Sequence, residues 1–104
     1  MSDIALFYVT FPSKAEAERV AETLLAERVA ACVNILARCT SIYRWEGRIQ
    51  GAEEVPALIK TRLMLAARLR ERLTMLHSYE VPVIEEWTAS ASAAVTAWLE
   101  AETG

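Results

Sequence analysis

The stretch that most constrains the fold is residues 31–49, which begin as an apolar strand and end among aromatic and charged side chains. Residues 32–36 have the composition of a buried strand, and residues 41–45 continue with large and polar residues in alternation. Glu46-Gly47 then predicts a turn, from which residues 48–49 return. Strands usually span about five or six residues, and this one would be roughly twice as long. We therefore expect its far end to pair outside the small domain, most simply with another copy of the chain.

Length and composition predict one domain, residues 1–104, part of whose apolar surface is buried against other copies of the chain. The chain is 54% hydrophobic, whereas soluble domains usually contain about 45–50% apolar residues. A domain of this size has too much surface for its volume to cover so much apolar material alone. We therefore assign the excess to a subunit interface.

Charge and the N-terminal pattern exclude two classes of partner. A net charge of −3 argues against nucleic acid, which requires a basic face. The apolar run at residues 4–11 is too short to span a bilayer, and no basic segment precedes it as in a signal peptide. Cys32 and Cys39 have no CxxC spacing and are expected to be free thiols in a reducing compartment. The expected location is the cytoplasm.

Hydrophobic periodicity predicts a strand and a helix, followed later by a second strand. Residues 4–11 are apolar at nearly every position, which is typical of a central strand covered on both faces. Ser13 and Glu16 have the spacing of a capping box, in which hydroxyl and carboxylate satisfy free amides at a helix start. Residues 53–61 read as a strand, and Pro56 should lie at an edge or bulge because it cannot donate to a ladder.

The order of elements predicts the fold class. The other expected elements are a loop at Gly51, a helix at 62–77, a turn at 78–82, a strand at 83–88, a loop at 89–92 and a short C-terminal helix. Two β-α-β units give an α+β, ferredoxin-like split βαβ sandwich, with an antiparallel sheet, helices on one face, an extended β-hairpin and a C-terminal helix. The alternative is a small doubly wound sheet with helices on both faces.

Several segments together resemble the CutA divalent-cation-tolerance family, and the resemblance covers nearly the whole chain. The matching segments are residues 30–35, 41–49, 54–55, 58–61, 77–82 and 98–99, in the order and spacing of the family. The resemblance implies a tight homotrimer, similar in form to PII-type nitrogen-signalling trimers, whose hairpin strands reach neighbouring subunits. It also implies binding of copper(II) or another divalent cation, with no organic cofactor. One departure is Val83, which stands where the family often has Glu and removes a carboxylate from any shared cleft.

Ligands for a soft metal would come from Cys32, Cys39 and His77, since thiolates and imidazoles suit copper and zinc. The two thiols are seven residues apart, so they point to opposite faces of a strand unless a bulge intervenes. The simpler interpretation of each cysteine is a small structural residue. His77 is the only histidine, and at a helix C-terminus it could simply bond a free carbonyl. By the resemblance we favour His77, and then Cys32, as metal contacts.

The remaining candidates belong to a predicted intersubunit cleft that binds a ligand. Tyr43 and Trp45 share one strand face, which is more often an interface than a ligand platform. Lys60 lies in an apolar strand and needs either a route to water or a carboxylate, for which Glu46 and Glu80 are the candidates. The resemblance adds Tyr79, beside Glu80, to this cleft.

Three functions follow from these features. The first is a homotrimeric divalent-cation-tolerance protein that binds copper or another divalent metal. The alternative is a PII-like trimeric signalling module that binds a small ligand or an unknown protein partner in the cleft, although no Gly-rich phosphate loop is present. The third is an enzyme using His77 and Glu80 for acid–base chemistry, which lacks a recognisable nucleophile–base pair. We expect that the protein is not an enzyme.

Overall fold

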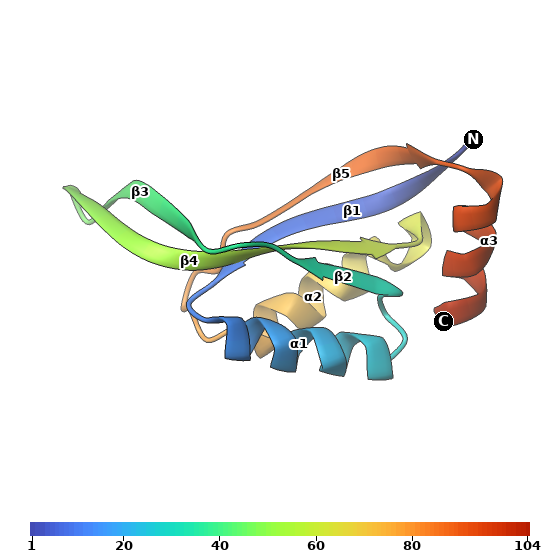
Figure 1. Ribbon diagram of the computed structural model, residues 1–104, viewed down its shortest axis with the longest axis horizontal. Coiled ribbons are helices and arrows are strands. Elements are labelled where there is room, and N and C mark those ends of the chain that lie inside the picture. Colours follow the sequence, from blue (N-terminus) through green and yellow to red (C-terminus); the bar gives the residue numbers. More distant parts are fainter.

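The fold was described from a computed structural model covering residues 1–104 (Figure 1). Its elements are β1 (Ser2–Phe11), α1 (Lys14–Ala26), β2 (Cys32–Ile35), β3 (Cys39–Trp45), β4 (Arg48–Thr61), a 3-10 turn η1 (Leu63–Leu65), α2 (Ala66–Leu76), β5 (Ile84–Ala91) and α3 (Ala93–Glu102). No helix is long and apolar enough to cross a membrane.

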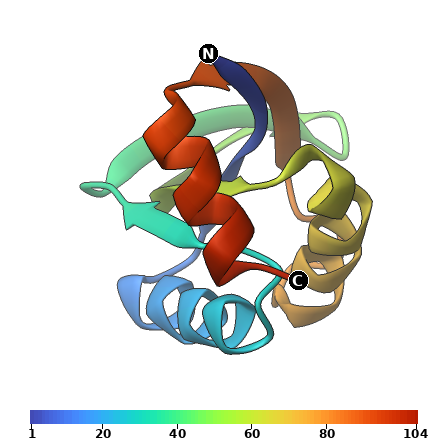
Figure 2. The same ribbon diagram turned by 90° about the vertical axis from the view of Figure 1, so that its right-hand side faces the viewer.

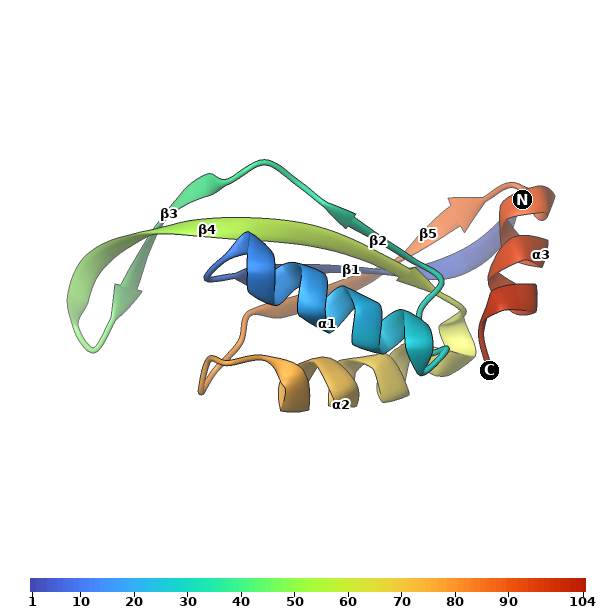
Figure 3. The ribbon, with the colours of Figure 1, turned by 60° about the horizontal axis from the view of Figure 1, so that its bottom comes forward.

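One antiparallel sheet organises the chain, in the order β2-β4-β1-β5, with β3 also paired to β4. Helices α1 and α2 lie side by side on one face of this sheet (Figure 3). Helix α3 lies at the end of the molecule opposite the β3–β4 hairpin (Figures 1 and 2). The ferredoxin-like sandwich with an extended hairpin is therefore confirmed. The doubly wound alternative is wrong, because α1 and α2 lie on the same face of the sheet and not on opposite faces (Figure 3).

The main core forms where the helices cover the sheet, on what we call the helix face. Strict alternation along β1 and β4 places every second side chain there, and the most buried of them are large and apolar. The largest fully buried side chains of this core are Phe7, Val9, Phe11, Leu24, Val29, Ile59, Leu69 and Leu73. The opposite face, which we call the open face, carries Leu6, Tyr8, Leu58 and Trp87, and only its far end is covered, by Leu99 of α3 against Ile4 and Ala91.

Helix α1 begins as the sequence predicts, but only half of the capping box forms. The Ser13 hydroxyl accepts a hydrogen bond from the Glu16 amide over 3.1 Å. The Glu16 carboxylate does not return to Ser13. It is buried and accepts instead from the backbone N–H of Ser78, in the turn after α2. The expected reciprocal bond is therefore wrong, because a backbone amide far away in the chain, that of Ser78, donates to the same carboxylate.

A β-bulge interrupts the predicted long strand. The register of pairing with β4 shifts by one residue between β2 and β3. The residue numbers of each β2–β4 pair add up to 92, as for Cys32 with Lys60, whereas those of each β3–β4 pair add up to 93, as for Cys39 with Glu54. The segment at 36–38 therefore holds one residue more than the stretch of β4 opposite it. Pro56 lies at this point. Its carbonyl accepts the backbone N–H of Leu36, and as a proline it has no N–H to donate in return. The prediction that Pro56 marks a bulge is confirmed, in a strand that is central rather than at an edge.

Strand β4 is longer than predicted and carries the hairpin beyond the body. It runs without a break from Arg48 to Thr61, so Gly51 lies inside the strand and not in a loop. Strand β5 likewise extends through residues 89–91, which were expected to be a loop. Glu46 and Gly47 both have positive φ, 52° and 78°, as a two-residue type I′ turn requires. The hairpin gives the molecule a long axis of 45 Å against 25 and 24 Å for the others (Figure 1).

Candidate functional site

A pocket of about 550 Å³ lies between the β3–β4 hairpin and the turn that joins α2 to β5. The hairpin supplies aromatic and polar residues from both of its strands, and the turn supplies one aromatic, one acidic and two aliphatic residues. The lining consists of Tyr43, Arg44, Trp45, Gln50, Glu54, Tyr79, Glu80, Val81 and Val83. The pocket therefore combines apolar walls with two carboxylates.

Glu54 is the most buried charged group of the pocket, with 8% of its surface exposed. The Tyr79 hydroxyl donates to its Oε2 atom over 2.8 Å. Burial, and then this hydrogen bond to a carboxylate, raise the pKa of Tyr79 well above its usual value. No lysine or arginine pairs with Glu54, because the ion pairs of the chain are Arg70–Glu86, Arg72–Glu27 and the contact of His77 with Glu16.

His77 fixes the turn that carries Tyr79. Its Nδ1 accepts the backbone N–H of Tyr79 over 3.1 Å, so Nε2 is left to donate to the carbonyl of Thr10 at 2.7 Å. The ring stacks on Phe11 with centroids 4.8 Å apart and planes at 12°, and its exposure is only 6%. Both nitrogens are thus engaged inside the protein.

The ligand types do not fit a resident metal centre in one chain. The bulge places the thiols of Cys32 and Cys39 on the same face, since their partners Lys60 and Glu54 are six positions apart on β4. That spacing separates them by about 20 Å. His77 has no free lone pair, and no group of three or more His, Cys, Asp or Glu side chains is close enough to hold an ion. The chemistry of the available donors therefore provides no complete site.

The structure brings together four of the six residues predicted for the cleft. Tyr43, Trp45, Tyr79 and Glu80 all line the pocket. The other two, Glu46 and Lys60, do not reach it.

Glu46 and Lys60 lie near opposite ends of β4. Glu46 sits in the hairpin turn, and Lys60 pairs with Cys32 and Leu6, roughly 40 Å away along the strand. The predicted pairing of Lys60 with Glu46 or Glu80 is wrong within one chain, because Lys60 forms no ion pair.

Glu54 was missed as a site residue. Sequence reasoning treated it as part of a strand, and its role depends on Tyr79, which is 25 residues away in the chain. The available signal was a charged residue directly before the buried run that starts at Val55, since such a position requires a partner.

Comparison with known proteins gives the family. A profile described as CutA1 divalent ion tolerance protein matches residues 5–102, nearly the whole chain. The chain belongs to the CutA1 family. The divalent-cation tolerance protein CutA of Thermus thermophilus is 38% identical over 105 residues and covers all of both chains, and that of Pyrococcus horikoshii is 47% identical over 79 residues, or 76% of each.

Solved CutA1 structures agree with the fold. The protein from Ehrlichia chaffeensis superposes with a TM-score of 0.93 at 30% identity, covering 100% of this chain and 98% of that one. CutA1 from P. horikoshii gives a TM-score of 0.91 at 40% identity, covering 96% and 98%. A relative from Archaeoglobus fulgidus, with a TM-score of 0.90 and 34% identity over 97% and 98% of the chains, is described as a periplasmic divalent cation tolerance protein. The family is described by tolerance of divalent ions and not by a reaction.

Proposed function

We propose that this CutA1 protein serves divalent-cation tolerance as a homotrimer in which each hairpin packs against neighbouring copies. The observation that carries the proposal is the exposure of apolar side chains on both faces of the hairpin. Ile42 and Ile49 are 75% and 72% exposed on one face, and Tyr43 and Trp45 are 41% and 46% exposed on the other. An isolated two-stranded ribbon is marginally stable in water, so burial by another copy would account for both its length and its composition.

Light scattering tests the assembly directly. We expect a mass of about 35 kDa, three times the 11.6 kDa of one chain. Its unfolding should also depend on protein concentration, because folding and assembly are then linked. A well-behaved particle with the mass of one chain would contradict the proposal.

The second part of the proposal concerns the metal. A single chain has no complete ligand set, so specific binding of copper(II) or another divalent cation would require groups from more than one copy. Calorimetry with copper(II) on the assembled protein, on a Cys32→Ser variant and on a His77→Ala variant tests this. We expect the His77→Ala variant, where folded, to retain the wild-type heat, because His77 has no free nitrogen. Heat lost in that variant alone would restore His77 as a metal ligand.

A second candidate function is binding of a small ligand or a protein partner, as in PII-type signalling trimers. The pocket between the hairpin and the α2–β5 turn favours it, because this pocket has a buried carboxylate with no cationic partner. A pull-down with and without metal would separate a partner-binding role from a metal-binding one. The proposal includes no catalysis, and the third hypothesis, acid–base chemistry by His77 and Glu80, is set aside because both nitrogens of His77 are already bonded.

We place the protein in the cytoplasm on the basis of two free, partly exposed thiols, which persist best in a reducing compartment. Cell fractionation tests the location, and recovery with periplasmic proteins would contradict it.

A further inference from the structure

The pocket lined by Tyr43, Trp45, Glu54 and Tyr79 has the chemistry of a site for an organic cation. The inference rests on the ligand-binding role proposed above and gives that role a ligand class. Its starting point is the carboxylate of Glu54, which is more than nine-tenths buried. One oxygen accepts the Tyr79 hydroxyl, and the other, Oε1, receives no hydrogen bond from the chain. Oε1 is not sealed in, because the only fully enclosed side-chain polar atom without a partner belongs to Thr61.

An unpaired buried carboxylate costs free energy unless a cation or further donors approach it. No lysine or arginine of the chain does so, and Tyr79 contributes a neutral donor, since burial and its hydrogen bond hold its pKa above the usual range. Glu80 adds a second carboxylate to the lining. The pocket therefore carries an excess of negative charge at its floor and rim.

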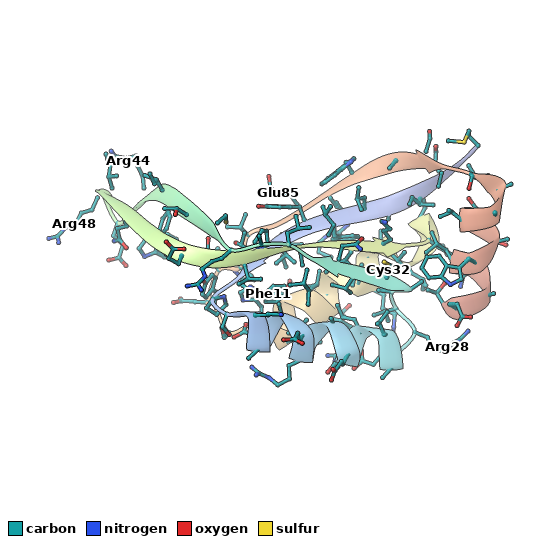
Figure 4. The ribbon with its side chains drawn as sticks, in the orientation of Figure 1. Phe11, Arg28, Cys32, Arg44, Arg48 and Glu85 are labelled. Carbon is teal, nitrogen blue, oxygen red and sulfur yellow. The ribbon has the colours of Figure 1, made fainter.

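The one cationic side chain of the lining does not offset this charge. The Arg44 guanidinium donates to the carbonyl of Gly47 over 3.4 Å, which holds it toward the hairpin turn. Figure 4 shows Arg44 and Arg48 at the tip of the hairpin, at the end of the molecule away from the body. The floor at Glu54 is left without a cation.

The walls identify the rest of the ligand. The rings of Tyr43, Trp45 and Tyr79 and the side chains of Val81 and Val83 present apolar and aromatic surface. In the proposed homotrimer the copy that packs against Tyr43 and Trp45 would border the same pocket. Aromatic faces attract ammonium groups, and best of all when the carbon substituents of the cation displace water. A hard divalent ion would instead require several oxygen ligands in one shell, and no group of three acidic, histidine or cysteine side chains exists here. We propose that this pocket binds an organic ammonium ion with an apolar body, whose charged nitrogen pairs with Glu54.

Titration calorimetry with benzylammonium chloride tests the proposal, with benzyl alcohol as the uncharged probe of similar shape. We expect benzylammonium to bind at least about tenfold more tightly than benzyl alcohol. The Glu54→Gln variant should lose about tenfold in affinity for benzylammonium, because Gln keeps the acceptor for Tyr79 and removes only the charge. The matched control is Glu53→Gln, since Glu53 is exposed, lies next to Glu54 and is absent from the pocket lining. Its affinity should equal that of the wild type.

Several results would overturn the proposal. These are no binding of benzylammonium, equal affinity for the two probes, or equal effects of the two glutamate variants. Stoichiometric displacement of benzylammonium by copper(II) would make the pocket a metal site instead. Light scattering on the same samples separates this proposal from the homotrimer. A trimer that binds no benzylammonium, and whose mass falls in the Glu54→Gln variant, would show that a neighbouring copy supplies the cation. A single-chain particle that binds benzylammonium would contradict only the homotrimer.

Discussion

The imidazole of His77 accepts the backbone amide of Tyr79 over 3.1 Å, and the two rings lie in contact with centroids 4.7 Å apart. This relationship orients Tyr79 so that its hydroxyl reaches Glu54 at the pocket floor. On its other side, His77 is held by the carbonyl of Thr10 and by stacking on Phe11. The pocket floor is therefore tied to the first strand of the core through one buried histidine.

Replacing His77 by Phe should destabilise the protein while keeping the stack on Phe11. Two backbone groups, the buried Thr10 carbonyl and the partly buried Tyr79 amide, would lose their partners. Each such loss typically costs about 1–3 kcal/mol, so we expect the free energy of unfolding to fall by roughly 2–5 kcal/mol. Denaturant unfolding at one fixed protein concentration measures it. An unchanged midpoint would mean that these hydrogen bonds contribute nothing.

Thr61→Val should stabilise the protein by about 1 kcal/mol. The Thr61 side chain is fully buried, and its hydroxyl has no hydrogen-bond partner, so the nearly isosteric Val removes a desolvated polar atom without leaving a cavity. Thr103→Val is the matched control with the opposite sign. The Thr103 hydroxyl accepts from Arg62 over 2.8 Å and donates to the carbonyl of Leu99, so its loss should destabilise. Thermal unfolding of the two variants in parallel checks the prediction. The prediction fails if both midpoint temperatures shift in the same direction.

The ion pair between α1 and α2 should make stability depend on pH in the acid range. The Nε and Nη2 atoms of Arg72 each lie 2.7 Å from a carboxylate oxygen of Glu27, and this hydrogen bonding lowers the pKa of Glu27 below its usual value of 4.5. A lowered pKa in the folded state gives a contribution that is present above about pH 4.5 and is lost as the pH falls further. We expect the Glu27→Gln variant to be less stable near pH 7 and to lose stability less steeply below pH 4.5. Curves of unfolding free energy against pH that run parallel for the variant and the wild type would contradict this.

Charges on the hairpin should disrupt assembly. We expect Trp45→Asp and Ile42→Lys each to give single chains or aggregate in light scattering, because each variant places a charge on one face of the hairpin where a neighbour should pack. Met75→Lys is the control, since Met75 is 68% exposed on α2, which lies outside the hairpin. A stable, soluble trimer from Trp45→Asp would remove Trp45 from the proposed interface.

Local patterns predicted the elements well, because their causes lie within a few residues. Ser13 caps α1 through an amide three residues away, and Glu46-Gly47 has the turn chemistry that a two-residue hairpin needs. Pro56 was predicted at an edge or a bulge from its missing N–H alone, and the bulge is what forms.

Features that depend on distant segments were less predictable. The bulge at residues 36–38 becomes visible only when both flanking strands are read against β4. The burial of Glu54 depends on Tyr79, which the α2–β5 turn delivers. Lys60 lies far from the hairpin turn of its own chain because β4 runs unbroken from Arg48 to Thr61, so its place in a cleft between subunits stays a prediction.

The surplus residue at 36–38 has a consequence for how the chain can change in length. Removing one residue there would bring β2 and β3 into a single register with β4, and Trp45 would still face Arg48 on the same side of the ribbon. Removing one residue from β3 itself would turn every side chain between the deletion and the bulge to the opposite side. Loss of a single residue should therefore be tolerated at the bulge and not a few positions later.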